Sequence, residues 1–326
     1  MAEPSRSPLL DVRDLKTSLY TRRGVLSAVD RVSFALEPGE TLAPVGESGC
    51  GKTMTALSVI RLVPDPPGRI EHGQVLFRGD DLLARSPEEM RRIRGDRISM
   101  VFQEPMTSLD PVFTVGRQLI ETVQAHRNVS RKEAWELSVG MLRKVRIPEP
   151  HRRMASYPHE LSGGMRQRVM IGIALACSPD LLIADEPTTA LDVTTQAQIL
   201  ELVRELREDL GMAVLLITHA LGVVAEMADR VAVMYAGHIV ESAPVDVIFG
   251  NPKHPYTVGL LQSIPDIELT RERLSTIPGT VPSLLHPPPG CYFWPRCPLA
   301  DQVCREAQPP LIQVGQSQYA ACWKAQ

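Results

Sequence analysis

The stretch Gly46-Glu47-Ser48-Gly49-Cys50-Gly51-Lys52-Thr53 lies between an apolar run at Leu42–Val45 and a helical pattern at Thr53–Leu62. It matches the phosphate-binding loop, in which glycines let backbone N–H groups wrap a phosphate and the helix N-terminus adds its dipole. Lys52 would neutralise the β- and γ-phosphates, and the hydroxyl of Thr53 would bind Mg²⁺. By composition alone, a chance match is expected in roughly one chain of this length in a hundred. A plain glycine turn is therefore the weaker interpretation.

Apolar runs that predict strands alternate with patterns that predict helices. The strand-like runs are Val32–Leu36, Leu42–Val45, Ile98–Phe102, Leu181–Ala184, Val214–Thr218 and Val231–Tyr235. Helical patterns between them are Thr53–Leu62, Thr194–Asp209 and Ala220–Asp229. This alternation is typical of an α/β domain with a largely parallel sheet.

The middle of the chain differs, because its pattern is mostly helical. The best helix candidates there are Val112–His126, Arg131–Val145 and Gly164–Cys177. We interpret residues from about 104 to 178 as a helical subdomain.

Length and composition fit an ordinary globular protein. The chain has 326 residues, 44% of them hydrophobic, and a formal net charge of -3, which allows one large domain plus an appendage. Lys and Arg are scattered, so nothing favours a nucleic-acid surface. The segment Met1–Arg6 leads into no apolar signal-peptide region, and runs such as Met212–Ile217 fall well short of the roughly 20 residues that span a bilayer. We expect a cytoplasmic chain that reaches a membrane only through partners.

Two carboxylates end the apolar run at Leu181–Ala184. A buried parallel strand delivers such acids to the carboxyl edge of a sheet, where Asp185 would hold Mg²⁺ through water and Glu186 would act as general base. Gln103 and His219 also follow predicted strands; Gln103 would bind Mg²⁺ or the attacking water, and His219 the γ-phosphate. Taken singly, the two carboxylates would be read as a solvated turn, and His219 as a structural histidine. Together with the phosphate loop, the functional interpretation is favoured.

A second candidate anion site is Leu161-Ser162-Gly163-Gly164-Met165-Arg166-Gln167-Arg168, where serine stands at the predicted cap of a helix. The plain alternative is a capped helix after a glycine turn. Since one phosphate loop already holds one nucleotide, a second phosphate cradle makes sense if it closes on the nucleotide of a partner.

In order and spacing these motifs, with Ala190-Leu191-Asp192, resemble those of ABC transporter ATPases over residues 8–250. The stretch Gln103-Glu104-Pro105-Met106-Thr107-Ser108-Leu109-Asp110-Pro111, the run His254-Pro255-Tyr256-Thr257 and a Pro- and Cys-rich tail narrow the resemblance to dipeptide and oligopeptide permease ATPases. The resemblance implies a nucleotide-binding domain at 1–250, in which a parallel-sheet core is joined by an antiparallel β part and the helical subdomain. A small irregular extension follows at 251–326, and it is called the tail below.

The resemblance also implies a mechanism. Two such ATPases would face each other head to tail, so that Ser162, Gly163 and Gly164 of one complete the ATP site of the other. The segment Ala190-Leu191-Asp192 would bridge the two sites. Residues near 103–111 would receive the coupling helix of a permease. Tyr20 is a candidate to stack on adenine, and a half-exposed strand aromatic is an equal alternative.

The function implied is that of an ATPase subunit of a membrane importer for di- and oligopeptides, which works by ATP-driven dimer closure. The implied partners are a paralogous ATPase, two permeases and an extracytoplasmic binding protein, and the implied location is the cytoplasmic face of the plasma membrane. The alternative is a soluble ABC ATPase acting on nucleic acid. Which solute is moved, whether dipeptide, oligopeptide, glutathione or nickel, stays open.

Two features depart from simple expectation. Pro44 lies in the strand before the phosphate loop and removes a ladder donor, which puts local stability in doubt. The tail cysteines, which are Cys291, Cys297, Cys304 and Cys322, are spaced too irregularly for a zinc ribbon. Two interpretations stay open: a [4Fe–4S] cluster, as some members of the resembled family carry, or buried unligated thiols.

Overall fold

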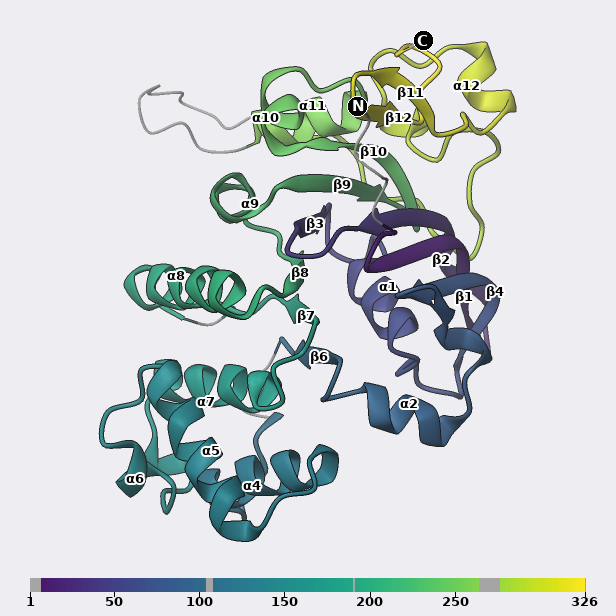
Figure 1. The fold of residues 1–326 in the computed structure, drawn as a ribbon. Helices are drawn as coiled ribbons and strands as arrows, with labels where there is room; N and C mark the ends of the chain where they lie inside the picture. The colour runs from purple at the N-terminus through teal and green to yellow at the C-terminus, as the bar shows by residue number, and fades with distance from the viewer. Residues whose placement is uncertain (1–6, 104–107, 190, 264–275, 326) are drawn as a thin grey trace, which may run out of the picture. The chain divides into compact units, whose positions relative to one another are not determined.

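The computed structural model describes residues 7–103, 108–189, 191–263 and 276–325 (Figure 1). Ala190 and residues 104–107, which belong to the predicted bridging and permease-facing segments, lie outside this range. Contacts divide the chain into two compact units, Met1–Leu83 with Ile217–Gln326, and Ala84–Leu216. The predicted boundaries at residue 250 and at about 104–178 stay predictions.

The first unit contains a twisted antiparallel sheet in the strand order β2-β1-β4-β5. Its strands are β1 (Leu10–Thr21), β2 (Gly24–Leu36), β4 (Gly68–Phe77) and β5 (Asp80–Asp81). Helix α1 (Lys52–Val59) is joined to this sheet by a buried hydrogen bond of 2.8 Å between the hydroxyls of Ser58 and Thr17. The antiparallel β part is therefore confirmed.

A second set of strands in this unit has the order β11-β12-β10-β9-β3. They are β3 (Thr41–Val45), β9 (Arg230–Tyr235), β10 (His238–Pro244), β11 (Ile312–Gly315) and β12 (Gln318–Ala320). Strand β3 runs parallel to β9, and Pro44 stands opposite Ala232 within this regular pairing. The proline is thus accommodated in the strand that leads into the phosphate loop.

Short helices surround these strands. They are α9 (Leu221–Met227), α10 (Val245–Gly250), α11 (Pro255–Gln262), α12 (Gln302–Glu306) and the 3-10 turns η1 (Leu82–Ala84) and η3 (Trp294–Arg296). The tail is tied to the sheet by the buried carboxylate of Glu241, which accepts hydrogen bonds from the backbone of Lys253 and His254 and from the side chain of Gln318. These charge-assisted bonds fix β12 and the start of α11 on β10.

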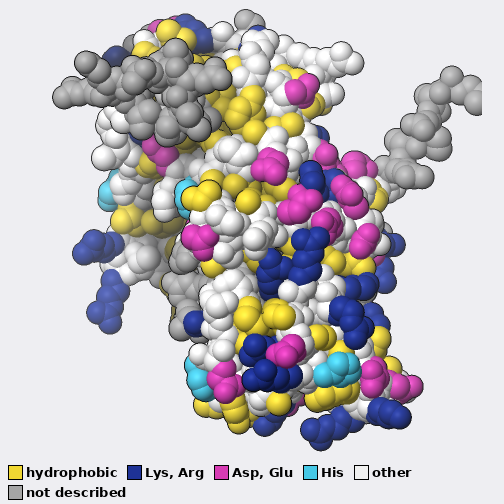
Figure 2. Space-filling model, turned by 90° about the vertical axis from the view of Figure 1, so that its left-hand side faces the viewer, with side chains coloured by type: hydrophobic (Ala, Val, Ile, Leu, Met, Phe, Trp, Pro, Cys, Tyr) yellow, Lys and Arg dark blue, Asp and Glu magenta, His cyan; other side chains and the backbone are white. Residues whose placement is uncertain are grey.

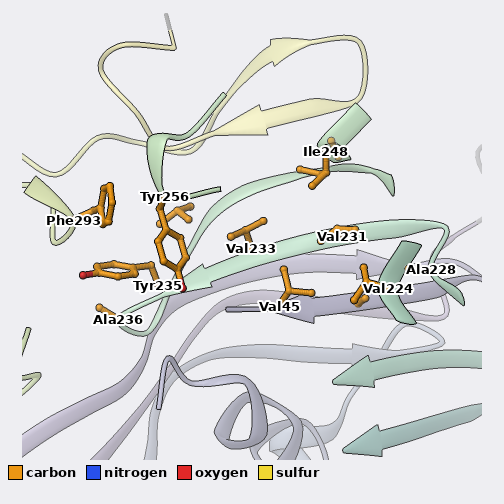
Figure 3. Packing of buried hydrophobic residues seen from close by; sticks show 13 residues of the cluster. Val45, Val224, Ala228, Val231, Val233, Tyr235, Ala236, Ile248, Tyr256 and Phe293 are labelled. Carbon is orange, nitrogen blue, oxygen red and sulfur yellow. The ribbon is translucent and has the colours of Figure 1, made fainter. Parts of the chain in front are cut away.

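An apolar core lies between β9 and the tail (Figure 3). The aliphatic side chains of Val45, Val231 and Val233 form one part of it. The rings of Tyr235, Tyr256 and Phe293 form the other, with centroids 4.6–5.4 Å apart in edge-on and tilted arrangements. Such pairs add to the burial energy of the rings and give the core a defined geometry.

The second unit combines a parallel strand set with a group of helices. Its strands follow the order β8-β7-β6 and are β6 (Ile98–Val101), β7 (Leu181–Asp185) and β8 (Ala213–Ile217). Its helices are α2 (Pro87–Ile93), α4 (Val115–His126), α5 (Arg131–Lys144), α6 (Pro150–Arg153), α7 (Gly163–Leu175), α8 (Val193–Leu210) and the 3-10 turn η2 (Pro158–Glu160). Strands β6 and β7 pair in parallel, with Ile98 opposite Leu181.

The predicted strands and helices are confirmed, with local shifts at their ends. Helix α4 begins at Val115 rather than at residue 112, because the hydroxyl of Thr114 caps it by accepting from the N–H of Arg117. Helix α1 ends at Val59, three residues before the predicted end, and its last turn is closed by the N–H of Ile60.

Candidate functional site

The phosphate loop joins β3 to α1 in the first unit. Its glycines are required by space as well as by conformation: a Cβ on Gly46 would lie 2.2 Å from the carbonyl oxygen of Met234, and one on Gly51 would lie 2.5 Å from that of Ala28. The φ angles of these residues, 151° and 109°, also favour glycine. The loop is therefore seated closely on the backbone of β2 and of β9.

Lys52 occupies the first turn of α1 and is almost fully buried. Its ammonium group donates hydrogen bonds to the carbonyl oxygens of Gly46 (2.7 Å) and Glu47 (3.1 Å). The charge is thus held over the loop, where a phosphate would meet it. Thr53, the predicted Mg²⁺ ligand, is exposed at the same helix start.

Two further residues predicted in the first unit, His219 and Tyr20, are solvent-accessible. His219 follows β8 and is exposed. Tyr20 lies near the end of β1, with 49% of its surface exposed, and its hydroxyl donates to a carboxylate oxygen of Glu71 at 2.5 Å. This bond raises the pKa of Tyr20. Its ring is available for stacking, and its role with adenine stays a prediction.

In the second unit, β7 delivers Asp185 and Glu186 to the end of the strand as predicted. Asp185 is buried. One carboxylate oxygen of Glu186, Oε2, accepts hydrogen bonds from the amide of Gln103 and from the hydroxyl of Thr189, each at 2.9 Å. The structure therefore brings together Gln103 and Glu186, which are 83 positions apart. Thr189 was not predicted.

Glu186 also has an unusual backbone conformation. Its φ is +46°, in the left-handed region that non-glycine residues rarely adopt. Such strain costs on the order of 1–3 kcal/mol and collects at functional sites, where the surrounding structure enforces it. The strain and the two hydrogen bonds hold one carboxylate in a fixed orientation, as a general base requires.

The predicted cap of α7 is confirmed. The hydroxyl of Ser162 accepts a hydrogen bond from the N–H of Met165, while Ser162 and Gly163 are exposed. Gly164 is confined, since a Cβ there would lie 2.8 Å from the side chain of Thr195. The buried Gln167 of the same helix donates to the carbonyl oxygen of Pro187. This bond ties α7 to the loop that follows Glu186.

Asp192 is the N-cap of α8. Its carboxylate accepts hydrogen bonds from the backbone N–H and the hydroxyl of Thr195, at 3.0 and 2.7 Å. The backbone bond is the main cause of a lowered pKa at Asp192. The side chain is exposed. Its capping bonds give Asp192 a structural task in addition to the bridging role predicted for it.

The tail cysteines carry free thiols. Burial, and after it the charges of the neighbouring tail thiols, raises the pKa of Cys291 to about 11. Burial also raises the pKa of Cys297 and of Cys322. Within residues 7–103, 108–189, 191–263 and 276–325, no group of three or more His, Cys, Asp or Glu side chains is arranged to hold a metal ion. The arrangement gives no support to the predicted [4Fe–4S] cluster.

Sequence reasoning also missed residues of the tail that reach the phosphate loop. Arg296 forms an ion pair with the side chain of Glu47. The hydroxyl of Tyr256 accepts a hydrogen bond from the backbone N–H of Glu47. Tyr256 belongs to the run His254–Thr257, which marked the resemblance but carried no assigned role. The only available signal for Arg296 was an arginine among apolar and proline residues.

Surface charge gives no reason to revise the expectation about nucleic acid. Figure 2 shows acidic and basic side chains interspersed on the face that it presents. Among the residues that the structure describes, none of the helices has the length and apolar character needed to cross a membrane.

Comparisons with known proteins agree with this geometry. A family model described as "ABC transporter" matches residues 29–189, and one described as "Oligopeptide/dipeptide transporter, C-terminal region" matches residues 240–304. The probable peptide ABC transporter ATP-binding protein y4tR of Sinorhizobium fredii is 56% identical over 325 residues, covering 99% of this chain and 97% of that protein. The chain belongs to the ABC transporter ATP-binding subunits.

Further ABC transporter relatives support the assignment. The oligopeptide transport ATP-binding protein OppD of Bacillus subtilis is 50% identical over 316 residues, covering 97% of this chain and 88% of OppD. A dimeric post-hydrolysis structure of the ATP-binding cassette MJ0796 with ADP and Pi is 25% identical, with a TM-score of 0.65, and covers 72% of this chain and 98% of that one. The chain thus has the ABC ATPase fold and hydrolyses ATP. These transporter relatives do not support the nucleic-acid alternative.

Proposed function

We propose that the chain is the ATPase subunit of a membrane ABC importer that powers the uptake of di- and oligopeptides. The observation that carries the proposal is the combination, in one chain, of a phosphate loop and an oriented carboxylate with a C-terminal region that matches oligopeptide and dipeptide transporters. Relatives named as peptide transport and peptide import ATP-binding proteins, 50–56% identical to this chain, support the substrate class.

By their chemistry, the predicted residues would suit Mg²⁺ and ATP. The loop N–H groups and Lys52 would hold the phosphates, and the oxygen donors of Thr53, Gln103 and Asp185 suit Mg²⁺. When bound, Mg²⁺ neutralises phosphate charge. The proposed role of Glu186 is to take a proton from the attacking water.

The remaining site residues have proposed roles at the nucleotide and at the interface with a second ATPase. His219 would hydrogen-bond the γ-phosphate, and Tyr20 would stack on adenine. Ser162, Gly163 and Gly164 would complete the ATP site of a facing subunit, and the exposure of Ser162 and Gly163 leaves the helix start of α7 accessible to an anion. We therefore propose a paralogous ATPase partner in a head-to-tail dimer.

The wider assembly follows from the same proposal. Two permease subunits would carry the peptide, an extracytoplasmic binding protein would supply it, and this chain would sit peripherally on the cytoplasmic face of the plasma membrane. The family resemblance and the peptide-transport relatives support this arrangement.

For the tail we propose a [4Fe–4S] cluster on Cys291, Cys297, Cys304 and Cys322. The support for this proposal is the resemblance to dipeptide-permease ATPases, some of which carry such a cluster in this extension; the described residues form no metal site of their own. No step of ATP hydrolysis is assigned to this group.

The test of the function is purification of the full chain, tagged, from its native membranes. We expect two permeases and a second ATPase in the complex, and ATP hydrolysis in liposomes that rises when peptide and binding protein are added. Substitution Lys52→Ala should abolish that hydrolysis. Isolation without permeases, or stimulation by nucleic acid instead of peptide, would contradict the proposal.

A further inference from the structure

Glu47, the second residue of the phosphate loop, is held at its side chain by the tail. The guanidinium of Arg296 donates to both carboxylate oxygens, with Nη1–Oε2 at 2.7 Å and Nη2–Oε1 at 2.9 Å. The side chain of Arg296 is 4% exposed and that of Glu47 is 30% exposed. A bidentate pair of this kind fixes orientation as well as distance.

The backbone of Glu47 is held by a second tail residue. Its N–H donates to the hydroxyl of Tyr256 at 2.8 Å, and Tyr256 is fully buried in the core between β9 and the tail. The ring is fixed there by Tyr235 and Phe293 (Figure 3). The backbone and the side chain of one loop residue are thus anchored by residues 209 and 249 positions later in the chain.

Arg296 is itself rigidly placed. Its Nε donates to the carbonyl oxygen of Pro278 at 2.9 Å, and Nη2 donates to that of Ile277 at 3.3 Å. Nη1 also lies 3.4 Å from the hydroxyl of Tyr235 in β9. A guanidinium with this many partners has lost its rotamer freedom before it meets Glu47, so it can impose a position on the loop.

The charge of the Glu47–Arg296 pair also bears on phosphate binding. A carboxylate within a phosphate loop opposes the binding of an anion, and a buried unpaired charge is costly. Arg296 neutralises Glu47 on the side of the tail, while Lys52 bonds to the carbonyl oxygens of Gly46 and Glu47. The lysine charge therefore stays available for the phosphates.

We propose that Arg296 and Tyr256 are positioning residues for ATP: through Glu47 they hold the phosphate loop in its binding conformation, so the C-terminal tail sets nucleotide affinity. This inference rests on the proposed placement of ATP on residues 46–53. It adds a role for the tail that phosphate contacts alone do not require.

The test is ATP titration of the full chain with Mg²⁺, together with KM and kcat in the assembled transporter. Arg296→Gln should weaken ATP binding about 10-fold, in line with the loss of hydrogen bonds to a charged group. Since the proposed base lies elsewhere, KM should rise while kcat stays within about threefold. Tyr256→Phe keeps the ring and removes only the acceptor, and should weaken binding by about threefold to tenfold.

A double-substitution cycle separates positioning from general destabilisation. Glu47→Gln combined with Arg296→Gln should bind ATP no worse than Arg296→Gln alone, because both changes remove one interaction. The matched control is Glu40→Gln, which breaks the Glu40–Arg230 pair at 3.0 Å in the same unit without touching the loop. It should lower thermal stability and leave ATP affinity unchanged.

The outcomes distinguish the two proposals. If Lys52→Ala binds ATP normally, the placement of ATP on this loop is wrong. If Lys52→Ala loses binding but Arg296→Gln and Tyr256→Phe both bind ATP as the unmodified chain does, the positioning role is wrong. Additive losses in the cycle, or an equal loss in Glu40→Gln, would also overturn it.

Discussion

Replacing Glu186 by glutamine tests the proposed general base most directly. Two side-chain hydrogen bonds to Glu186, from Gln103 and Thr189, end on the same carboxylate oxygen, Oε2. The amide oxygen of glutamine can accept both, so the loop and its unusual backbone should persist. What is lost is the capacity to take a proton.

The expected loss of activity is that of the general base alone, because the hydrogen bonds to this side chain are kept. General bases contribute about 10²–10⁴-fold to rate, which corresponds to about 3–5 kcal/mol of activation free energy. We expect Glu186→Gln to reduce kcat of the assembled transporter by that factor, while ATP affinity of the isolated chain changes by less than about threefold because the phosphate loop is untouched. The ATP-loaded variant should accumulate as a closed dimer.

The assay is steady-state phosphate release, with ATP binding measured in parallel and dimer formation followed by size-exclusion chromatography. Thr189→Val is the matched control: it removes one donor to Oε2 but keeps the carboxylate, so its kcat should fall by only about 10-fold. If Glu186→Gln retains more than about a tenth of the normal kcat, the assignment of Glu186 as base is refuted.

Three other predictions concern separate parts of the chain. Ser162→Ala in this subunit alone should impair only the ATP site of the paralogous partner that it faces, and the isolated chain should be a poor ATPase; full activity from a strict monomer would exclude this. Burial lowers the pKa of His254 to about 3, against about 6.5 in an unfolded chain, so stability should fall as pH decreases from 6.5 towards 3, by up to about 1.4 kcal/mol per pH unit. Asn at this position can replace Nδ1 as acceptor for the N–H of Tyr256, which His254 caps at 3.0 Å, so denaturant titrations of His254→Asn should show a flatter pH profile. Protein purified without oxygen should contain iron and sulfide in near-equal amounts, and Cys297→Ser should lose both but still bind ATP; an iron-free preparation with freely alkylated thiols would reject the cluster.

The parts of the site that sequence predicted are those whose chemistry is local. The phosphate loop needs glycines, a lysine and a helix start within a few residues, and Ser162 caps the helix that it precedes. The acids at 185 and 186 stand out because an apolar run ends on them. In each case the pattern and the chemistry occupy the same short segment.

What sequence could not supply depends on pairing between distant segments. The antiparallel strands β1 and β4 are only half-buried, so their apolar alternation is weak, and their register is visible only in the sheet. Thr189 has no signal of its own beside Glu186. The Glu47–Arg296 pair joins residues 249 positions apart. Arg296 lies in the tail, where the many prolines gave no reason to predict short elements such as α12 and β12.

A partly buried ion pair such as Glu47–Arg296 contributes little if stability alone is required. Desolvation offsets much of the attraction, and apolar residues of similar volume often stabilise a fold as well or better. What such a pair supplies instead is a fixed orientation, since the guanidinium of Arg296 donates to both carboxylate oxygens of Glu47. The double substitution Arg296→Met with Glu47→Leu should lose stability only through the carbonyl oxygens of Pro278 and Ile277, which lose their donors. Its ATP binding should be weaker than this loss of stability explains. Stability and nucleotide affinity would then separate, as a positioning role requires and a purely structural role does not.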